Sequence, residues 1–141
     1  MVQFSWTEDL YTHNTLIDGD HSELIRLINV LFEAMQSAEN ERMRKAMHAL
    51  IAYTGEHFAR EEAEMERIEY VAALAHKAEH GKLLQQVVEL EEMLDAGGKI
   101  NIPAVADFLS DWLRTHILAT DMKLAAALNA HAACARIAQA H

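Results

Sequence analysis

The sequence predicts an all-α protein: an antiparallel up-down four-helix bundle with an N-terminal arm and a short C-terminal fifth helix. Helix-favouring residues such as Ala, Leu, Glu, Met and Lys dominate the 141 residues, which include one proline and five glycines. Apolar residues recur at steps of three and four, the period of an amphipathic helix. The segments between these stretches are short, which favours antiparallel neighbours within one domain spanning residues 1–141.

Residues 1–17 are expected to form an extended arm that apolar side chains anchor to the bundle. The anchors are Phe4, Trp6, Leu10 and Tyr11. The first helix is expected over residues 18–37, where Asp18 or Asp20 can cap the first turn. Its apolar face consists of Leu24, Ile25, Ile28, Leu31, Phe32 and Met35. His21 precedes Leu24 by three positions and therefore shares this face.

The second and third helices are expected over residues 41–69 and 71–96, with Asn40 as the cap of the former. The pair Gly97-Gly98 predicts the end of the latter, because glycine readily adopts the left-handed conformation that ends helices. Steps of three and four define one stripe on each helix. The first stripe is Met43, Met47, Leu50, Thr54, His57, Glu61, Met65 and Ile68. The second is Ala73, His76, His80, Leu83, Val87, Leu90 and Leu94.

The fourth helix is expected over residues 102–117, with Asn101 as its cap, and an alanine-rich fifth, shorter helix over residues 121–141. His116 lies on the apolar stripe of the fourth helix, and Asp121 follows five residues later. Residues five apart differ in direction by about 140° on an ideal α-helix, so the two cannot both face the interior. We predict a π-bulge or a break between them.

Seven potential metal ligands lie on these inward faces. They are His21, His57, Glu61, His76, His80, His116 and Asp121. A polar or charged side chain buried without a partner costs several kcal/mol, so a common partner is needed. Neutral imidazole and carboxylate are ligands of iron, copper, nickel and zinc. Seven ligands are too many for one tetrahedral ion and suit two ions bridged by the carboxylates.

Other metal-binding patterns fit less well. Ferritin-like di-iron bundles need a glutamate three residues before a histidine, and no glutamate here has that spacing. Zinc proteases need glutamate directly after the first histidine of the pair, whereas Lys77 follows His76. A structural zinc site built on cysteines is also excluded, because Cys134 is the only cysteine.

Charge and composition narrow the partners and the compartment. The formal net charge of −10 disfavours nucleic acid or an anionic membrane surface as a partner. No apolar stretch approaches the roughly 20 residues of a membrane span, and the first residues lack the features of a signal peptide. One cysteine permits no intrachain disulfide, which fits a reducing compartment. We therefore expect a cytoplasmic protein.

The motifs now resemble those of a known family. Ile17-Asp-Gly-Asp-His21, His57-Phe-Ala-Arg-Glu61, His76-Lys-Ala-Glu-His80 and His116-Ile-Leu-Ala-Thr-Asp121 are similar to the ligand motifs of hemerythrins. The single-domain bacterial hemerythrins are the most similar, and the resemblance extends from Trp6 to about Leu124. One departure is Asp20, where the family commonly has glutamine. This carboxylate could contact one of the metal ligands without binding metal itself, or it could cap the helix, and we favour the cap.

The resemblance implies a di-iron centre with an oxo or hydroxo bridge. His76, His80 and His116 would hold one iron, His21 and His57 the other, and Glu61 and Asp121 would bridge them. The second iron would keep an open position for dioxygen. The resemblance also implies an apolar oxygen pocket. Its lining would be Phe58, Trp112, Leu113 and Ile117.

Reversible dioxygen binding, for storage or for delivery to an oxygen-consuming protein, is the function that the resemblance implies. An enzymatic role is not expected, although a di-iron centre allows weak oxidase or peroxidase activity. The alternatives are a redox enzyme that reduces peroxide or nitric oxide, and an oxygen or redox sensor that acts through a separate partner. The sequence does not distinguish iron from manganese or zinc.

Overall fold

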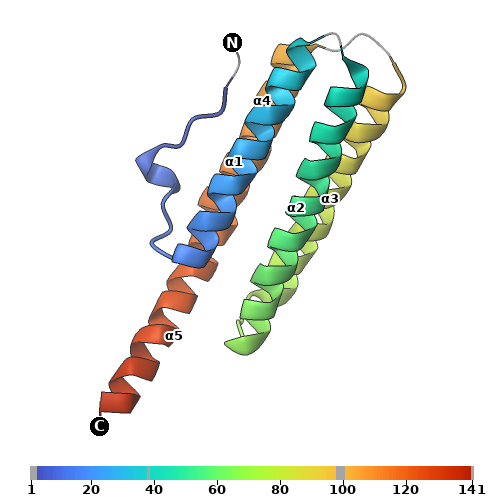
Figure 1. The fold of residues 1–141 in the computed structure, drawn as a ribbon. Helices are drawn as coiled ribbons and strands as arrows, with labels where there is room; N and C mark the ends of the chain where they lie inside the picture. The colour runs from blue at the N-terminus through green and yellow to red at the C-terminus, as the bar shows by residue number, and fades with distance from the viewer. Residues whose placement is uncertain (1–2, 38, 98–100, 141) are drawn as a thin grey trace.

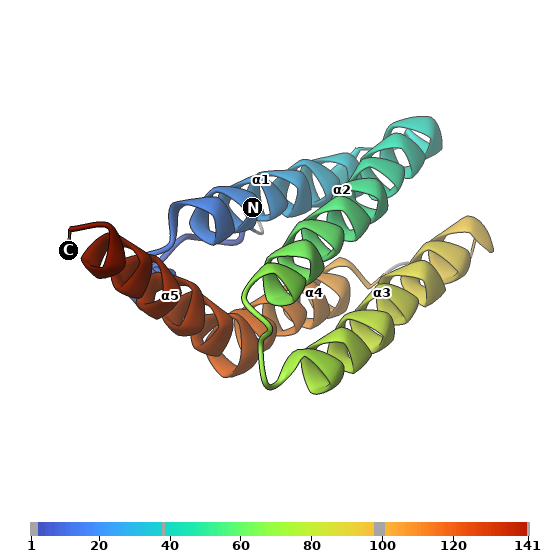
Figure 2. The same ribbon diagram turned by 90° about the horizontal axis from the view of Figure 1, so that it is seen from below.

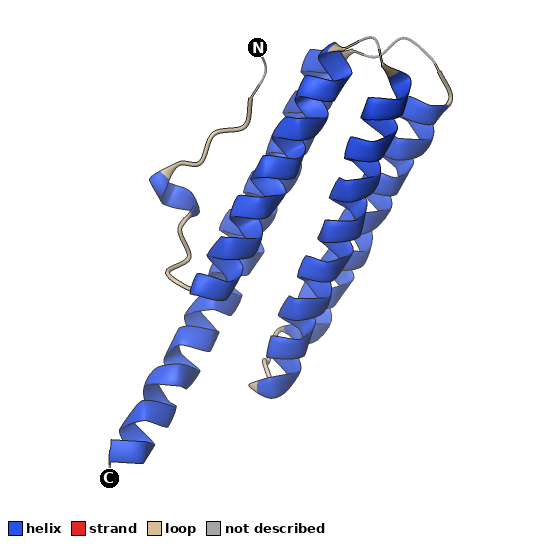
Figure 3. Cartoon of the chain, in the orientation of Figure 1, coloured by secondary structure: helices blue, strands red, loops and turns tan. Residues whose placement is uncertain are grey.

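The computed structural model describes residues 3–37, 39–97 and 101–140, and every regular element in these ranges is helical (Figures 1 and 3). The elements are the 3₁₀ turn η1 (Glu8–Leu10), α1 (Thr15–Gln36), α2 (Asn40–Arg67), α3 (Ala73–Asp95), α4 (Ile102–His116), the π-helical segment η2 (Ile117–Asp121) and α5 (Met122–Ala140). The expected all-α class is confirmed. None of the described helices is both long and apolar enough to cross a membrane.

Helices α1 to α4 run alternately up and down and form the bundle. Figure 2, a view along the bundle, shows α1 and α2 in one layer and α4 and α3 in the other. The inward stripes form the core, where Leu24, Ile28, Leu50, Val87 and Leu109 are buried. Because complete burial of such a side chain contributes about 1.5–3 kcal/mol, these stripes hold the four helices together.

The N-terminal arm lies along the bundle (Figure 1), and α1 begins at Thr15, three residues earlier than expected. Of the four expected anchors, Phe4 and Leu10 are buried and Trp6 is partly buried, whereas Tyr11 is 47% exposed, so the expectation for Tyr11 was wrong. Helix α1 begins at Thr15, where the side chain of Asn14 accepts a hydrogen bond from the Ile17 amide. The expectation that Asp18 or Asp20 caps this helix was therefore wrong. Asn14 has the same capping chemistry and lies one turn earlier.

The expected caps and ends of the other helices are partly confirmed. Asn101 caps α4 as expected, and Gly97 ends α3 with a φ of 76°. Gly98 lies outside the described residues. Asn40 is the first residue of α2 rather than its cap. Helix α3 begins at Ala73, two residues later than expected, because a turn over residues 68–72 joins it to α2.

The expected irregularity between His116 and Asp121 is confirmed as the π-helical segment η2. The chain passes through η2 into α5 without a break, and α5 extends beyond the end of the bundle (Figure 1), at an angle to α4 that Figure 2 shows. The fifth helix expected over residues 121–141 is confirmed as α5, whose 19 residues make it shorter than α1, α2 and α3 but longer than α4, which has 15. The buried side chains of the described part of α5 lie in its first turns and are Leu124, Ala125 and Leu128.

Candidate metal centre

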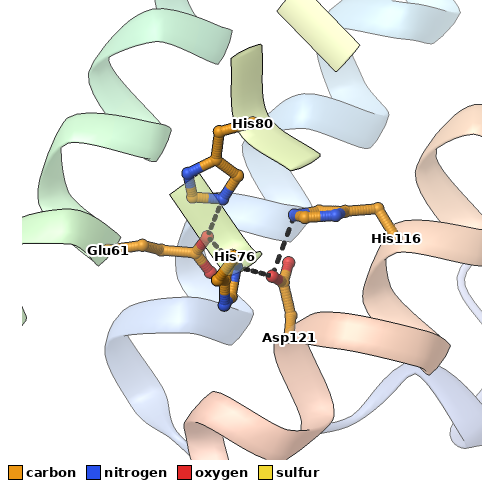
Figure 4. A group of neighbouring side chains, drawn as sticks. All are labelled: Glu61, His76, His80, His116 and Asp121. Atoms are coloured by element: carbon orange, nitrogen blue, oxygen red, sulfur yellow. Dashed lines mark hydrogen bonds and ion pairs between the residues drawn. The ribbon is translucent and has the colours of Figure 1, made fainter. Parts of the chain in front are cut away.

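The seven side chains singled out in the sequence meet inside the bundle, and each is at most 4% exposed. They form two overlapping groups whose potential ligand atoms lie within 4.8 Å of one another. The first group is Glu61, His76, His80, His116 and Asp121, which Figure 4 shows. The second is His21, His57, Glu61 and Asp121. Only the two carboxylates belong to both groups.

The oxygens of Asp121 divide between the two groups. Oδ1 lies 2.9 Å from Nε2 of His116 and 3.1 Å from Nε2 of His76 (Figure 4). Oδ2 lies 2.7 Å from Nε2 of His21 and 3.9 Å from Nε2 of His57. Each oxygen of this carboxylate therefore faces a different pair of imidazoles.

Glu61 divides its oxygens in the same way. Oε1 lies 2.9 Å from Nε2 of His80 and 3.5 Å from Nε2 of His76. Oε2 lies 3.6 Å from Nε2 of His57. Both shared carboxylates thus span the space between one group of histidines and the other.

Local helix geometry aims these side chains at the same region. His57 and Glu61, like His76 and His80, are four residues apart and stack one turn above the other. His116 and Asp121 are five apart, and the i→i+5 bonding of η2 brings both to the inner face. The additional residue in the π-helical turn therefore places Asp121, the seventh side chain, in the cluster.

The electrostatics of the cluster follow from burial opposed by ion pairing. Burial raises the pKa of Asp121, but its contacts with His116, His21, His57 and His76 lower that pKa well below the usual range. Burial lowers the pKa of His57, yet the carboxylates of Asp121, Asp20 and Glu61 raise it to about 9. The cluster thus keeps its carboxylates ionised and available as ligands.

The donor set fits a metal better than it fits a set of hydrogen bonds. Nε2 of His57 and Oε2 of Glu61 are buried and find no hydrogen-bond partner among the described residues, although they lie only 3.6 Å apart. Buried polar atoms are normally paired, so these two atoms call for a partner between them. Imidazole nitrogen with carboxylate oxygen suits first-row transition metals. The cluster can hold a metal.

Comparison with known proteins agrees with this geometry. The family model of the "Hemerythrin HHE cation binding domain" matches residues 12–128. The chain belongs to the hemerythrin family. Members of this family bind non-haem iron and dioxygen.

Relatives and solved structures extend over most of the chain. The bacteriohemerythrin of Pseudomonas paraeruginosa is 33% identical over 117 residues, which are 83% of this chain and 76% of that protein. The bacteriohemerythrin of Methylococcus capsulatus is 31% identical, over 86% of this chain and 93% of that protein. A crystal structure of a wild-type hemerythrin superposes with a TM-score of 0.79 at 31% identity, covering 88% of this chain and 96% of that one.

The four apolar residues expected around the hemerythrin centre are all buried. The ring of Phe58 stacks on His80, with centroids 3.9 Å apart and planes 7° from parallel. The indole Nε1 of Trp112 donates a hydrogen bond to the Leu83 carbonyl, which ties α4 to α3. Leu113 and Ile117 are 2% and 0% exposed. These side chains can exclude water from the cluster.

Asp20 has a different place from the one expected. Its carboxylate is buried and accepts hydrogen bonds from His57, Arg60 and Tyr53 of α2, so it does not cap α1. Burial raises the pKa of Asp20, but these contacts lower it far more, so the group is ionised. Tyr53 and Arg60 were missed, although both lie within four positions of His57 on the same helix and were thus recognisable as its neighbours.

Proposed function

We propose that this member of the hemerythrin family reversibly binds dioxygen at a pair of iron ions, for storage or for delivery to an oxygen-consuming protein. The observation that carries the proposal is the division of the carboxylate oxygens of Glu61 and Asp121 between two groups of histidines. A carboxylate in that arrangement can bridge two ions. When bound, the iron pair supplies the electrons for reversible interaction with dioxygen and an open position for it.

The two groups of residues would differ in how completely they surround an ion. His76, His80 and His116 with the two carboxylates offer five donors, whereas His21 and His57 with the same carboxylates offer four. The group with fewer protein donors leaves more room for a small ligand. Glu61 and Asp121 would also balance part of the positive charge, which the apolar surroundings make unfavourable otherwise.

Phe58, Trp112, Leu113 and Ile117 would keep water out of the oxygen site. A dry site slows the escape of reduced oxygen and hence the irreversible oxidation of the centre. Phe58 would also hold the ring of His80 in place through their stacking contact. Reversible binding needs no protein acid or base, and the four side chains expected to line the oxygen site are all apolar. A cytoplasmic location would suit the exposed, free thiol of Cys134.

Metal analysis and optical spectroscopy of the purified protein test the proposal. We expect two irons per chain, and a visible absorption band that appears with dioxygen and disappears under argon. His57→Ala should abolish this band, whereas the control His131→Ala changes an exposed histidine and should preserve it. One metal per chain would contradict the proposal. Immediate irreversible oxidation with turnover of peroxide or nitric oxide would indicate an enzyme, and an oxidation-dependent change of oligomeric state a sensor.

A further inference from the structure

Asp20 is a buried carboxylate outside the seven-residue cluster, and all four of its strong contacts are to side chains of α2. Oδ1 accepts hydrogen bonds from the Tyr53 hydroxyl at 2.7 Å and from Nη2 of Arg60 at 2.8 Å. Oδ2 accepts from Nδ1 of His57 at 2.9 Å and from Nε of Arg60 at 2.9 Å. The guanidinium of Arg60 also lies over the Tyr53 ring, 5.1 Å from its centroid. The carboxylate is therefore held from three sides.

His57 differs in this respect from the other histidines of the cluster. Nδ1 of His21, of His76 and of His116 is buried without a hydrogen-bond partner among the described residues. Nδ1 of His80 lies 3.4 Å from Glu62, whose side chain is 34% exposed. Only His57 has a close, buried carboxylate at its outer nitrogen. It is also one of the two histidines in the group with fewer donors.

The contact has a defined chemical consequence for the imidazole. When Nδ1–H donates to a carboxylate, the lone pair is on Nε2, the atom that faces Glu61 and Asp121. A carboxylate acceptor also fixes the plane of the ring and makes the imidazole a stronger donor to a metal. The hydrogen bonds from Arg60 and Tyr53 withdraw part of the negative charge and so moderate this effect.

Resting on the proposed iron centre, we propose that Asp20 is a positioning residue that sets the orientation, the tautomer and the donor strength of His57, while Arg60 and Tyr53 hold Asp20 and moderate its charge. The iron bound by His57 would then favour the ferric over the ferrous state more than it would beside a neutral amide. Asp20 thereby tunes the reduction potential of the half of the centre that has room for dioxygen.

The first test compares Asp20→Asn with Glu23→Gln by spectroelectrochemical titration of the iron-loaded protein. Both substitutions remove one carboxylate charge from α1, but Glu23 pairs with Arg26 at the surface and forms no hydrogen bond or ion pair with a described histidine. Asp20→Asn should raise the midpoint potential, by about 59 mV for each tenfold decrease in the ratio of the site's affinity for ferric iron to its affinity for ferrous iron. Glu23→Gln should leave the midpoint potential unchanged. Asp20→Asn should also weaken metal binding about 10- to 100-fold at one of the two positions.

A second variant gives the opposite sign and keeps the carboxylate. Tyr53→Phe removes one hydrogen bond from Oδ1 of Asp20, which leaves more negative charge to act on His57. The midpoint potential should therefore fall. If Asp20→Asn fails to fold, Tyr53→Phe decides alone: a lower potential supports the proposal, and an unchanged potential overturns it.

The zinc-loaded protein separates this proposal from the proposed function. Its NMR spectrum should contain a strongly downfield, slowly exchanging Nδ1–H resonance of His57, which moves upfield in Asp20→Asn and stays in place in Glu23→Gln. This readout requires no iron and no dioxygen, so it holds even if the wild-type protein fails to bind either. A His57 resonance and a potential that are both unaffected by Asp20→Asn would overturn the role of Asp20.

Discussion

Single residues decide the chemistry of the cluster through the few atoms that they place. Each carboxylate oxygen of Asp121 and of Glu61 faces the histidines of only one of the two ligand groups. A substitution that removes or displaces one of these oxygens would therefore remove a donor from one group. The surrounding apolar side chains supply no donor and, under the proposed function, would act by excluding water. Substitutions in these two sets should therefore affect different measured quantities.

Leu113→Gln should speed the oxidation of the oxygenated protein several-fold without changing its metal content. Leu113 is buried three residues before His116, and a polar side chain there would admit water beside the cluster. The loss of the absorption band of the oxygenated protein in air measures the oxidation rate, and elemental analysis measures the metal content. Leu109→Gln is the control, because Leu109 is equally buried on α4 but lies one turn farther from His116. Loss of metal in Leu113→Gln would mean that Leu113 acts structurally.

At the scale of elements, η2 sets the register between α4 and α5. In a π-helical turn one additional residue is accommodated, so the residues that follow keep the orientation they would have in a shorter α-helix. Asp121 and the packed residues Leu124 and Leu128 depend on this register together. The site and the docking of α5 are thus set by the same local irregularity.

Deleting Ala119 should convert η2 into regular α-helix and preserve the metal content. The deletion leaves His116 and the aspartate four residues apart, which share one face of an α-helix. Inserting one alanine after Ala119 should instead rotate Asp121 by about 100° and abolish metal binding. Elemental analysis and circular dichroism check both variants. Equal metal content in the insertion variant would contradict the role of the register.

The distal part of α5 should be dispensable for the bundle. Residues 131–139 are exposed except for half-buried Ala133, whereas Leu128 is 3% exposed and packs in the cluster with Ile17 and Met65. Removing residues 131–141 should therefore change the free energy of unfolding by no more than about 0.5 kcal/mol. Leu128→Ala should cost about 2–5 kcal/mol in the same urea titration. A large loss on truncation would show that the tail makes contacts essential for stability.

At the scale of the whole molecule, the bundle buries a charged and polar cluster that its four helices share. Two ionised carboxylates and five imidazoles occupy the position where apolar side chains would otherwise fill the core. Nε2 of His57 and Oε2 of Glu61 nevertheless have no hydrogen-bond partner among the described residues, so part of the cost of burying the cluster is not offset. Global stability should therefore respond to metal and to pH.

Removing the metal should lower the free energy of unfolding by several kcal/mol, because the seven ligands lose their common partner. Thermal melts of the iron-loaded and the chelator-treated protein measure the difference, and His131→Ala serves as a variant with unaltered ligands. Identical melting temperatures with and without metal would be incompatible with a metal shared by four helices.

The metal-free protein should become less stable as the pH rises. The carboxylates around His57 and His76 outweigh their burial and raise the pKa of each to about 9, above the value of about 6.5 in unfolded chains. The stability that their protonation contributes is complete below about pH 6.5 and is lost as the pH rises through about 9. Urea titrations at several pH values test this. The metal-loaded protein should show a smaller decline, and a metal-free protein that gains stability over this range would refute the assignment.

The sequence alone determined the helical class, the inward faces, the seven cluster residues and the irregularity before Asp121. All of these follow from helical periodicity and spacing, which are local properties of the chain. Only the tertiary structure decided that Asp20 reaches His57, Arg60 and Tyr53 on the neighbouring helix, and that Asn14 rather than Asp18 or Asp20 begins α1. It also decided where α5 leaves the core. The reason is physical: the partner of a side chain on another helix depends on the rotation and axial register of both helices, which no local pattern contains.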